Sequence, residues 1–158
     1  MDDPSSSRTI SIVNRSGRRA PSALIRRAVE AVCVQHKARA GEVSILLTDD
    51  AEMKDLNHRF RNLSESTDVL TFPAENPMLL GDIAISVPYA RKQAELRKVS
   101  LQQEIGYLAI HGGLHLLGFD DETEDDRRVM VEQMNRAAIA AGLKPDHEWA
   151  SLLHEAHE

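Results

Sequence analysis

The 158-residue chain has one cysteine, few aromatic side chains and no long hydrophobic run. The single cysteine, Cys33, excludes an intrachain disulfide and any zinc site built from paired cysteines. Aromatic residues make up only 4% of the chain, which argues against an extended surface for stacking nucleic-acid bases. Hydrophobic residues make up 42%, so a globular protein with a substantial core is expected at this length.

Two further absences concern the location of the protein. The first residues, MDDPSSSR, are acidic and polar, and they lack the basic start and apolar centre of a signal peptide. The longest apolar stretch, residues 105–119, is too short to span a bilayer and contains two histidines. Both features predict a cytoplasmic protein that does not associate with membranes.

The net charge of −6 is unevenly distributed along the chain. Residues 1–40 carry eight basic and three acidic side chains, whereas residues 101–158 carry four basic and twelve acidic ones. An acidic total argues against a protein that coats nucleic acid. A local basic face is still compatible with this charge, and an RNA ligand would then be held mainly through its phosphates.

Hydrophobic periodicity predicts strands that alternate with helices. The expected strands are residues 9–13, 43–47, 68–72 and 82–87, and the expected helices are residues 22–38, 49–61, 88–98, 101–117 and 124–141. Ser100 and Gln103 form a capping box before the fourth helix. The alternation predicts an α+β fold, a mixed sheet of about four strands with helices packed on it. Residues 1–158 are expected to form one domain, with residues 1–7 and the last few residues flexible.

Two histidines, His111 and His115, lie four positions apart on the predicted helix 101–117. Because side chains at i and i+4 share one face, the two imidazoles are expected one turn apart, as in the metal-binding helix of zincin proteases. Gly118 can adopt the left-handed conformation that ends a helix and reverses the chain. The reversal would bring Asp121 beneath the helix as an oxygen ligand. Three protein ligands with an open fourth position are typical of a catalytic metal site.

Several alternatives remain open at this point. A bare pair of histidines is more often one buried, hydrogen-bonded side chain and one at the surface than a metal site. Asp120 is a second candidate for the third ligand, with Asp121 hydrogen-bonded outside it. A peptidase is disfavoured, because zincin proteases carry a glutamate after the first histidine, and this chain has Gly112, which cannot accept a proton.

Three stretches resemble the bacterial YbeY-type endoribonucleases, the rRNA maturation factors. They are LNHRFRNLSESTDVLTFP (56–73), GDIAIS (81–86) and HGGLHLLGFD (111–120), in this order and spacing. The resemblance implies a zincin-like fold and metal-dependent cleavage of single-stranded RNA, used for the 3′ end of 16S rRNA and in ribosome quality control. It also implies rRNA as substrate and the small ribosomal subunit or its assembly factors as partners, with no DNA or membrane.

The resemblance carries site residues over one by one. His111 and His115 match two zinc ligands of the family, and Asp121 stands where the family has a third, histidine ligand. Arg61 matches the arginine near the family's active site, where its planar fork is expected to hold a phosphate oxygen. One Zn²⁺ per chain is implied, although two histidines and one carboxylate also suit Fe²⁺, Mn²⁺ or Ni²⁺. The carboxylate lowers the formal charge of the site, so activity is expected at more alkaline pH.

Two other classes of function are weighed against the endoribonuclease. One is a hydrolase of another class on the same scaffold, a peptidase or amidase, against which Gly112 counts. The other is a non-catalytic, ribosome-associated module whose metal is structural, which Asp121 favours if it weakens the site.

Overall fold

The computed structural model describes residues 9–38, 41–61, 68–75 and 79–150. In chain order the elements are β1 (Thr9–Asn14), α1 (Ser22–Gln35), β2 (Glu42–Thr48), α2 (Asp50–Arg61), β3 (Val69–Pro73), β4 (Leu79–Ser86), α3 (Val87–Arg97), α4 (Leu101–Leu116) and α5 (Glu124–Ala140). The predicted α+β class and four-stranded mixed sheet are confirmed. The expectation of flexible ends falls on residues outside the described ranges, and the assignment of the whole chain to one domain stays a prediction.

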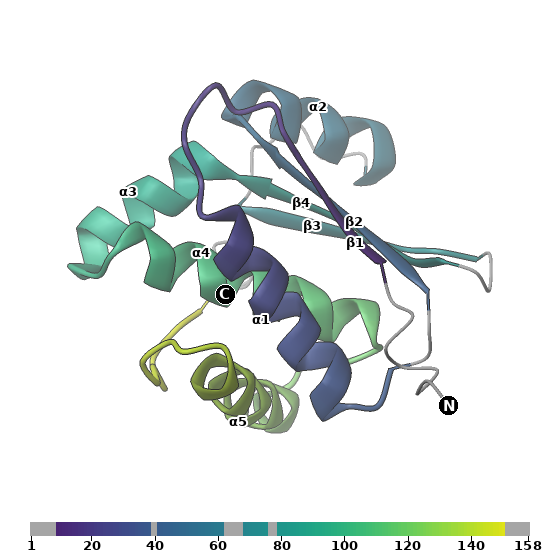
Figure 1. Ribbon diagram of the computed structural model, residues 1–158, viewed down its shortest axis with the longest axis vertical. Helices are drawn as coiled ribbons and strands as arrows, with labels where there is room; N and C mark the ends of the chain where they lie inside the picture. Colours follow the sequence, from purple (N-terminus) through teal and green to yellow (C-terminus); the bar gives the residue numbers. More distant parts are fainter. Residues whose placement is uncertain (1–8, 39–40, 62–67, 76–78, 151–158) are drawn as a thin grey trace.

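The sheet has the strand order β1-β2-β4-β3. β1, β2 and β4 run parallel, and β3 pairs antiparallel with β4 at one edge. Figure 1 shows α2 on one face of the sheet and α1 and α4 on the other, with α5 packed beneath α1 and α4. Helix α4 is therefore enclosed between the sheet and α5.

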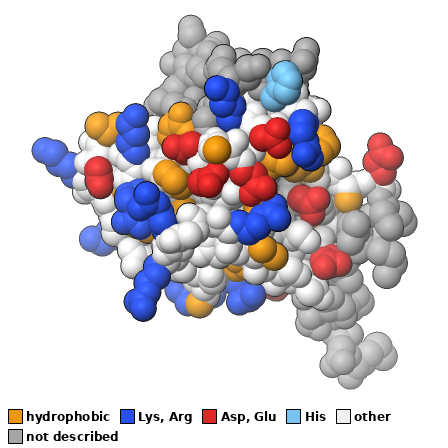
Figure 2. Space-filling model, turned by 90° about the horizontal axis from the view of Figure 1, so that it is seen from above, with side chains coloured by type: hydrophobic (Ala, Val, Ile, Leu, Met, Phe, Trp, Pro, Cys, Tyr) orange, Lys and Arg blue, Asp and Glu red, His pale blue; other side chains and the backbone are white. Residues whose placement is uncertain are grey.

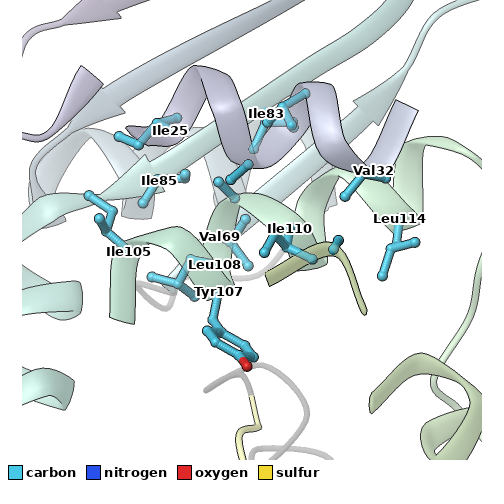
Figure 3. Close-up of a cluster of buried hydrophobic side chains, with 14 of the residues drawn as sticks. Ile25, Val32, Val69, Ile83, Ile85, Ile105, Tyr107, Leu108, Ile110 and Leu114 are labelled. Carbon is cyan, nitrogen blue, oxygen red and sulfur yellow. The ribbon is translucent and has the colours of Figure 1, made fainter. Parts of the chain in front are cut away.

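The main core lies between the sheet and the helices α1 and α4 (Figure 3). Ile83 and Ile85 project from β4 toward this core, and Leu108 and Ile110 fill it from α4. Every residue of α4 from Glu104 to Leu114 is buried. A helix that is apolar around its whole circumference is stable only when it is covered on all sides, as α4 is here. Side chains on α4 are consequently held on a rigid support.

A second, smaller core lies under α2 and consists of Met53, Leu70 and Ala84. Phe60 follows Met53 at helical spacing on α2 but lies largely outside this core. The Phe60 side chain is 60% exposed and contacts the edge of the Phe72 ring, with 5.2 Å between ring centroids.

Two other local predictions differ from the structure. Val87 was assigned to the fourth strand but begins α3, because the Ser86 hydroxyl accepts a hydrogen bond from the Tyr89 amide and caps the helix there. Ser100 caps α4 as predicted, by accepting from the Gln103 amide. The Gln103 side chain does not complete the capping box and instead bonds both backbone groups of Lys144. In the described part of the chain, no helix combines the length and apolar character needed to cross a membrane.

Candidate metal centre

The chain reverses immediately after α4, as the sequence predicted. Gly118 has φ +96°, a conformation that strains any residue with a Cβ atom. The amides of Gly118 and Phe119 donate to the carbonyls of His115 and Leu114, both at 3.0 Å, and close the end of the helix. The Phe119 ring then packs on His36, with 4.7 Å between ring centroids, which anchors the loop to the end of α1.

Asp120 and Asp121 have different roles in this loop. The exposed Asp120 carboxylate accepts hydrogen bonds from the amides of Asp121 at 2.7 Å and Glu122 at 3.2 Å, so it forms a local turn. Arg127 on α5 donates to the carbonyls of Asp121 and Glu122 and supports the same turn. The Asp121 carboxylate lies toward the two histidines. The geometry therefore favours Asp121 over Asp120 as the third ligand.

Three donor atoms converge at this point. The Nε2 atoms of His111 and His115 are 3.0 Å apart. The Asp121 carboxylate oxygens lie 3.6 Å from His111 Nε2 and 3.7 Å from His115 Nε2. A tetrahedral Zn²⁺ with bonds of about 2.0–2.1 Å separates its donors by roughly 3.3–3.4 Å. The three side chains thus have the chemistry and spacing that one divalent ion requires, and they form the single such group within the described residues.

The centre is buried on one side and open on the other. The His111 side chain is 5% exposed, whereas those of His115 and Asp121 are 25% and 20% exposed. A cavity of about 70 Å³ lies against His111 and Asp121, and its other walls come from α5 and the C-terminal segment. The Trp149 ring lies 5.2 Å from the His111 ring, measured between centroids. The His115 and Asp121 side chains are therefore partly accessible to solvent.

Gly112 lies where α4 approaches the sheet most closely. A Cβ atom at this position would lie 2.9 Å from Ile83 Cγ2 and 3.4 Å from methyl groups of Thr71 and Val69. Contacts below 3.0 Å are essentially never observed for real Cβ atoms, so a glutamate would not fit here without displacing β4 or α4. The absence of the zincin-protease base is thus built into the packing of this helix on its sheet.

Arg61, the remaining candidate from the sequence, cannot be placed relative to this centre, and the other acidic and histidine side chains of the described residues form no further group of this kind. Arg61 is the last residue of α2, and its side chain falls outside the described residues. Asp68 is buried beside β3, and Asp82 is exposed on β4. His147 is exposed, and His154 and His157 lie beyond the described part of the chain.

The sequence missed how the segment after α5 is built into the centre. Trp149, in this segment, is 4% exposed. Its contact with His111 was not predicted, because no periodic pattern links a tail residue to a helix nearly forty positions earlier. Glu104, a buried carboxylate that receives the indole N–H, was missed for the same reason.

The chain is also similar in sequence to known proteins. The family described as Endoribonuclease YbeY matches residues 10–141. The endoribonuclease YbeY of Gloeobacter violaceus is 42% identical over 125 residues, which are 73% of this chain and 63% of that protein. The corresponding protein of Geobacillus thermodenitrificans is 37% identical over 127 residues, 72% of this chain and 81% of that one.

A solved structure supports the assignment of the fold. The solution structure of TM1509 from Thermotoga maritima aligns with a TM-score of 0.61 and 26% sequence identity, covering 84% of this chain and 89% of that chain. The sequence match includes all three proposed ligands and the whole sheet except Thr9, the first residue of β1. On this combined ground, the chain belongs to the endoribonuclease YbeY family.

Proposed function

We propose that this protein is a metal-dependent endoribonuclease of rRNA processing, with His111, His115 and Asp121 as its metal ligands. RNA cleavage follows from membership of the endoribonuclease YbeY family. The observation that carries the assignment to these residues is the convergence of two imidazole nitrogens and one carboxylate within 3.7 Å of one another. The proposed ion is Zn²⁺, and Fe²⁺, Mn²⁺ and Ni²⁺ suit the same ligands.

The protein side chains have distinct tasks in this proposal. A bound divalent ion supplies a Lewis acid, which polarises a phosphoryl oxygen or lowers the pKa of a water molecule. His111 and His115 hold their positions because α4 is packed on all sides. Asp121 is held by the Gly118 reversal and the Asp120 turn, and it places one negative charge next to the site.

Arg61 is proposed to bind a phosphate group of the RNA. It ends α2, directly after the exposed Phe60. A guanidinium group matches two phosphate oxygens with two parallel N–H donors and stays charged throughout the neutral range. It would thereby stabilise the negative charge that develops at phosphorus during cleavage.

The charge distribution agrees with substrate binding through a few phosphates rather than through one large basic face. On the side of the molecule shown in Figure 2, basic and acidic side chains are interspersed. We propose single-stranded rRNA as the substrate, the 3′ end of 16S rRNA as its site, and ribosome quality control as a further role. The proposed partners are the small ribosomal subunit or its assembly factors, in the cytoplasm.

A peptidase is the less favoured function for this centre. The base that zincin proteases use would occupy position 112, where a Cβ atom would lie 2.9 Å from Ile83 Cγ2 and force its surroundings to shift. A non-catalytic module with a structural ion is disfavoured by the exposure of His115 and Asp121, since structural zinc sites are closed by four protein ligands.

The deciding experiment is cleavage of single-stranded RNA, double-stranded RNA and casein, with and without a chelator. We expect the protein to cleave only single-stranded RNA, and the chelator to abolish that cleavage. His115→Ala should reduce both bound metal and cleavage at least about 100-fold. His147→Ala is the matched control, because it removes an exposed histidine outside the cluster and should leave cleavage unchanged. Cleavage that survives His115→Ala would contradict the proposed centre, and metal binding without any turnover would favour the structural module.

A further inference from the structure

The segment after α5 reaches the metal centre through Trp149. This residue lies beyond the part of the chain that matches the family, which ends at residue 141. Its ring is tilted by 53° to the His111 ring, with centroids 5.2 Å apart, and its side chain is almost completely buried. Tyr107 lies on the same helix face one turn before His111, with its ring 6.0 Å from the indole. The indole therefore packs along the face of α4 that carries the first histidine.

A buried hydrogen bond fixes the indole in this place. Trp149 Nε1–H donates to Glu104 Oε2 at 2.8 Å, and the Glu104 side chain is only 2% exposed. Glu104 and His111 are seven positions apart on α4, which puts them on one helix face about 10 Å apart. The indole spans this gap, with its N–H at the carboxylate and its ring at the imidazole. Its position is thus defined at both ends.

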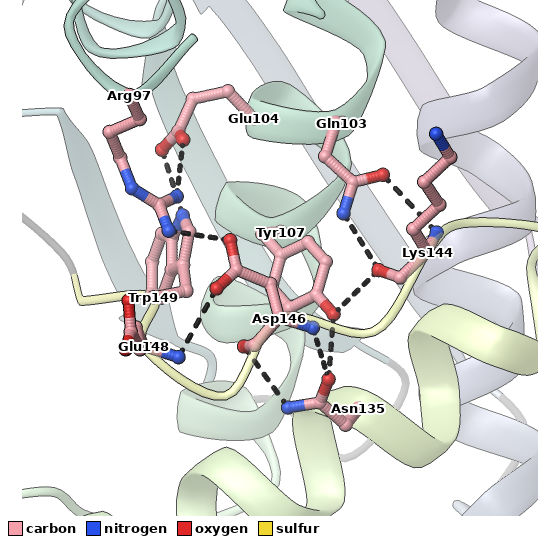
Figure 4. A network of polar contacts seen from close by, with 9 residues as sticks. All are labelled: Arg97, Gln103, Glu104, Tyr107, Asn135, Lys144, Asp146, Glu148 and Trp149. Carbon is pink, nitrogen blue, oxygen red and sulfur yellow. Dashed lines mark hydrogen bonds and ion pairs between the residues drawn. The ribbon is translucent and has the colours of Figure 1, made fainter. Parts of the chain in front are cut away.

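The chain segment that carries Trp149 is itself tied to α3 and α5 (Figure 4). The Arg97 guanidinium pairs with the Glu104 carboxylate at 3.0 Å and with the Asp146 carboxylate at 2.5 Å. Asn135 on α5 accepts from the Asp146 amide at 2.6 Å and donates to the Asp146 carbonyl at 3.2 Å. Three of these four contacts are to Asp146, three positions before the indole. The segment has little freedom to withdraw from α4.

We propose that Trp149 is a positioning residue of the metal centre, which holds the His111 imidazole in the orientation that faces His115 and Asp121. The inference rests on the metal role proposed for His111. An imidazole that can rotate loses conformational freedom when it binds a metal, and this cost weakens binding. Packing the indole against the ring removes that freedom before the metal arrives. The C-terminal segment is accordingly a part of the site, although it lies outside the family match.

Metal affinity distinguishes positioning from a merely structural role. We would measure the dissociation constants of Zn²⁺ and Ni²⁺ by calorimetry for the wild type, Trp149→Phe and Trp149→Ala. Trp149→Ala is expected to bind about 10-fold more weakly, as is typical when a residue that orients a ligand is removed. Trp149→Phe keeps an aromatic ring but loses the bond to Glu104, so an intermediate loss of about 3-fold is expected.

A control variant separates affinity from stability. Ile45→Val removes one methylene from the core at the central strand β2 and alters no hydrogen bond. It should lower the melting temperature of the metal-free protein, as the Trp149 variants do, while leaving both dissociation constants unchanged. If the Trp149 variants melt lower but bind both metals with the affinity of the wild type, Trp149 is structural only and the inference is wrong.

The fluorescence of Trp149 gives an independent readout, because it is the single tryptophan of the chain. Cu²⁺ or Ni²⁺ bound beside His111 should quench this fluorescence with one equivalent per chain. The quenching should disappear in His115→Ala, which retains Trp149 and His111. A wild-type protein that binds no metal would overturn the proposed centre and the inference together. A protein that binds one equivalent without any change in fluorescence would overturn the inference alone.

Discussion

Helix α4 contributes to two clusters of ionisable side chains, one near each of its ends. The two clusters differ in how their charges are compensated. Near the beginning of α4, Glu104 pairs with Arg97, which also binds Asp146, so a cation of the chain joins two anions. Near its end, His111, His115 and Asp121 bring together three electron-pair donors. Donors at such distances repel one another unless a proton or a metal ion lies between them.

The difference agrees with the roles proposed for them, a structural role for the Glu104 cluster and metal binding for the His111 cluster. In the Glu104 cluster, side chains of the protein compensate the negative charges, because Arg97 pairs with both carboxylates. Glu104 also accepts the hydrogen bond of the indole N–H. Its burial still disfavours the charged carboxylate and raises the pKa of Glu104, although the bonds from Trp149 and Arg97 oppose this shift. The His111 cluster consists of two histidines and one aspartate, and the divalent ion proposed for it would supply the compensating positive charge.

Removing one side chain from each cluster tests most directly whether the two clusters differ in their contribution to stability. Arg97→Ala leaves the buried Glu104 carboxylate without its cation, which should lower the free energy of unfolding by about 3 kcal/mol. His115→Ala should cost less than about 1 kcal/mol in metal-free protein, because it removes a partly exposed donor. Urea denaturation in the presence of a chelator measures both values. Equal losses would show that the two clusters stabilise the protein in the same way.

Much of this arrangement could be predicted from the sequence, and the limit has a physical cause. The spacing of His111 and His115 and the glycine at 118 specify a local geometry, so the approach of Asp121 followed from helix periodicity and one chain reversal. The Arg97, Glu104 and Asp146 cluster depends on which elements meet in space, and no local pattern encodes that. The exposure of Phe60 shows a related limit, since periodicity gives the face of a helix but not where the sheet beneath it ends. The alkaline displacement expected from Asp121 stays a prediction.

The structural cluster extends to Tyr107, whose titration gives a second and smaller effect. Tyr107 is fully buried, and its hydroxyl bonds the Asn135 side chain at 2.9 Å and the Lys144 carbonyl at 3.0 Å. Burial raises the pKa of Tyr107 from 10.0 to about 12. The folded protein therefore keeps this proton between pH 10 and pH 12, where the unfolded chain releases it.

The free energy of unfolding should consequently fall as the pH rises through this window. At pH 11 the contribution of Tyr107 to the loss is about 1.4 kcal/mol relative to pH 9. Tyr107→Phe has no proton to release, so the loss over this range should be smaller in the variant by that amount. Urea denaturation at pH 9, 10 and 11 compares the two slopes. Parallel slopes for wild type and variant would mean that the phenol ionises equally well in the folded protein.

Two adjacent glycines of α4, directly after His111, offer the finest test. A Cβ atom at Gly112 would contact Ile83 Cγ2 at 2.9 Å, whereas one at Gly113 would meet Val32 at ordinary distances of 3.5–3.7 Å. Both substitutions to alanine gain about 1 kcal/mol of helix propensity. Gly112→Ala must in addition push α4 away from the sheet, at a cost of about 1–3 kcal/mol.

The expected outcomes are therefore opposite in sign for neighbouring positions. Gly113→Ala should raise the free energy of unfolding by up to about 1 kcal/mol, and Gly112→Ala should lower it by about 1 kcal/mol. Thermal unfolding of both variants in the presence of a chelator measures the difference without any contribution from metal binding. If Gly112→Ala proved as stable as Gly113→Ala, α4 could move freely on its sheet, and it would not be the rigid support that holds His111 at a fixed distance from Asp121.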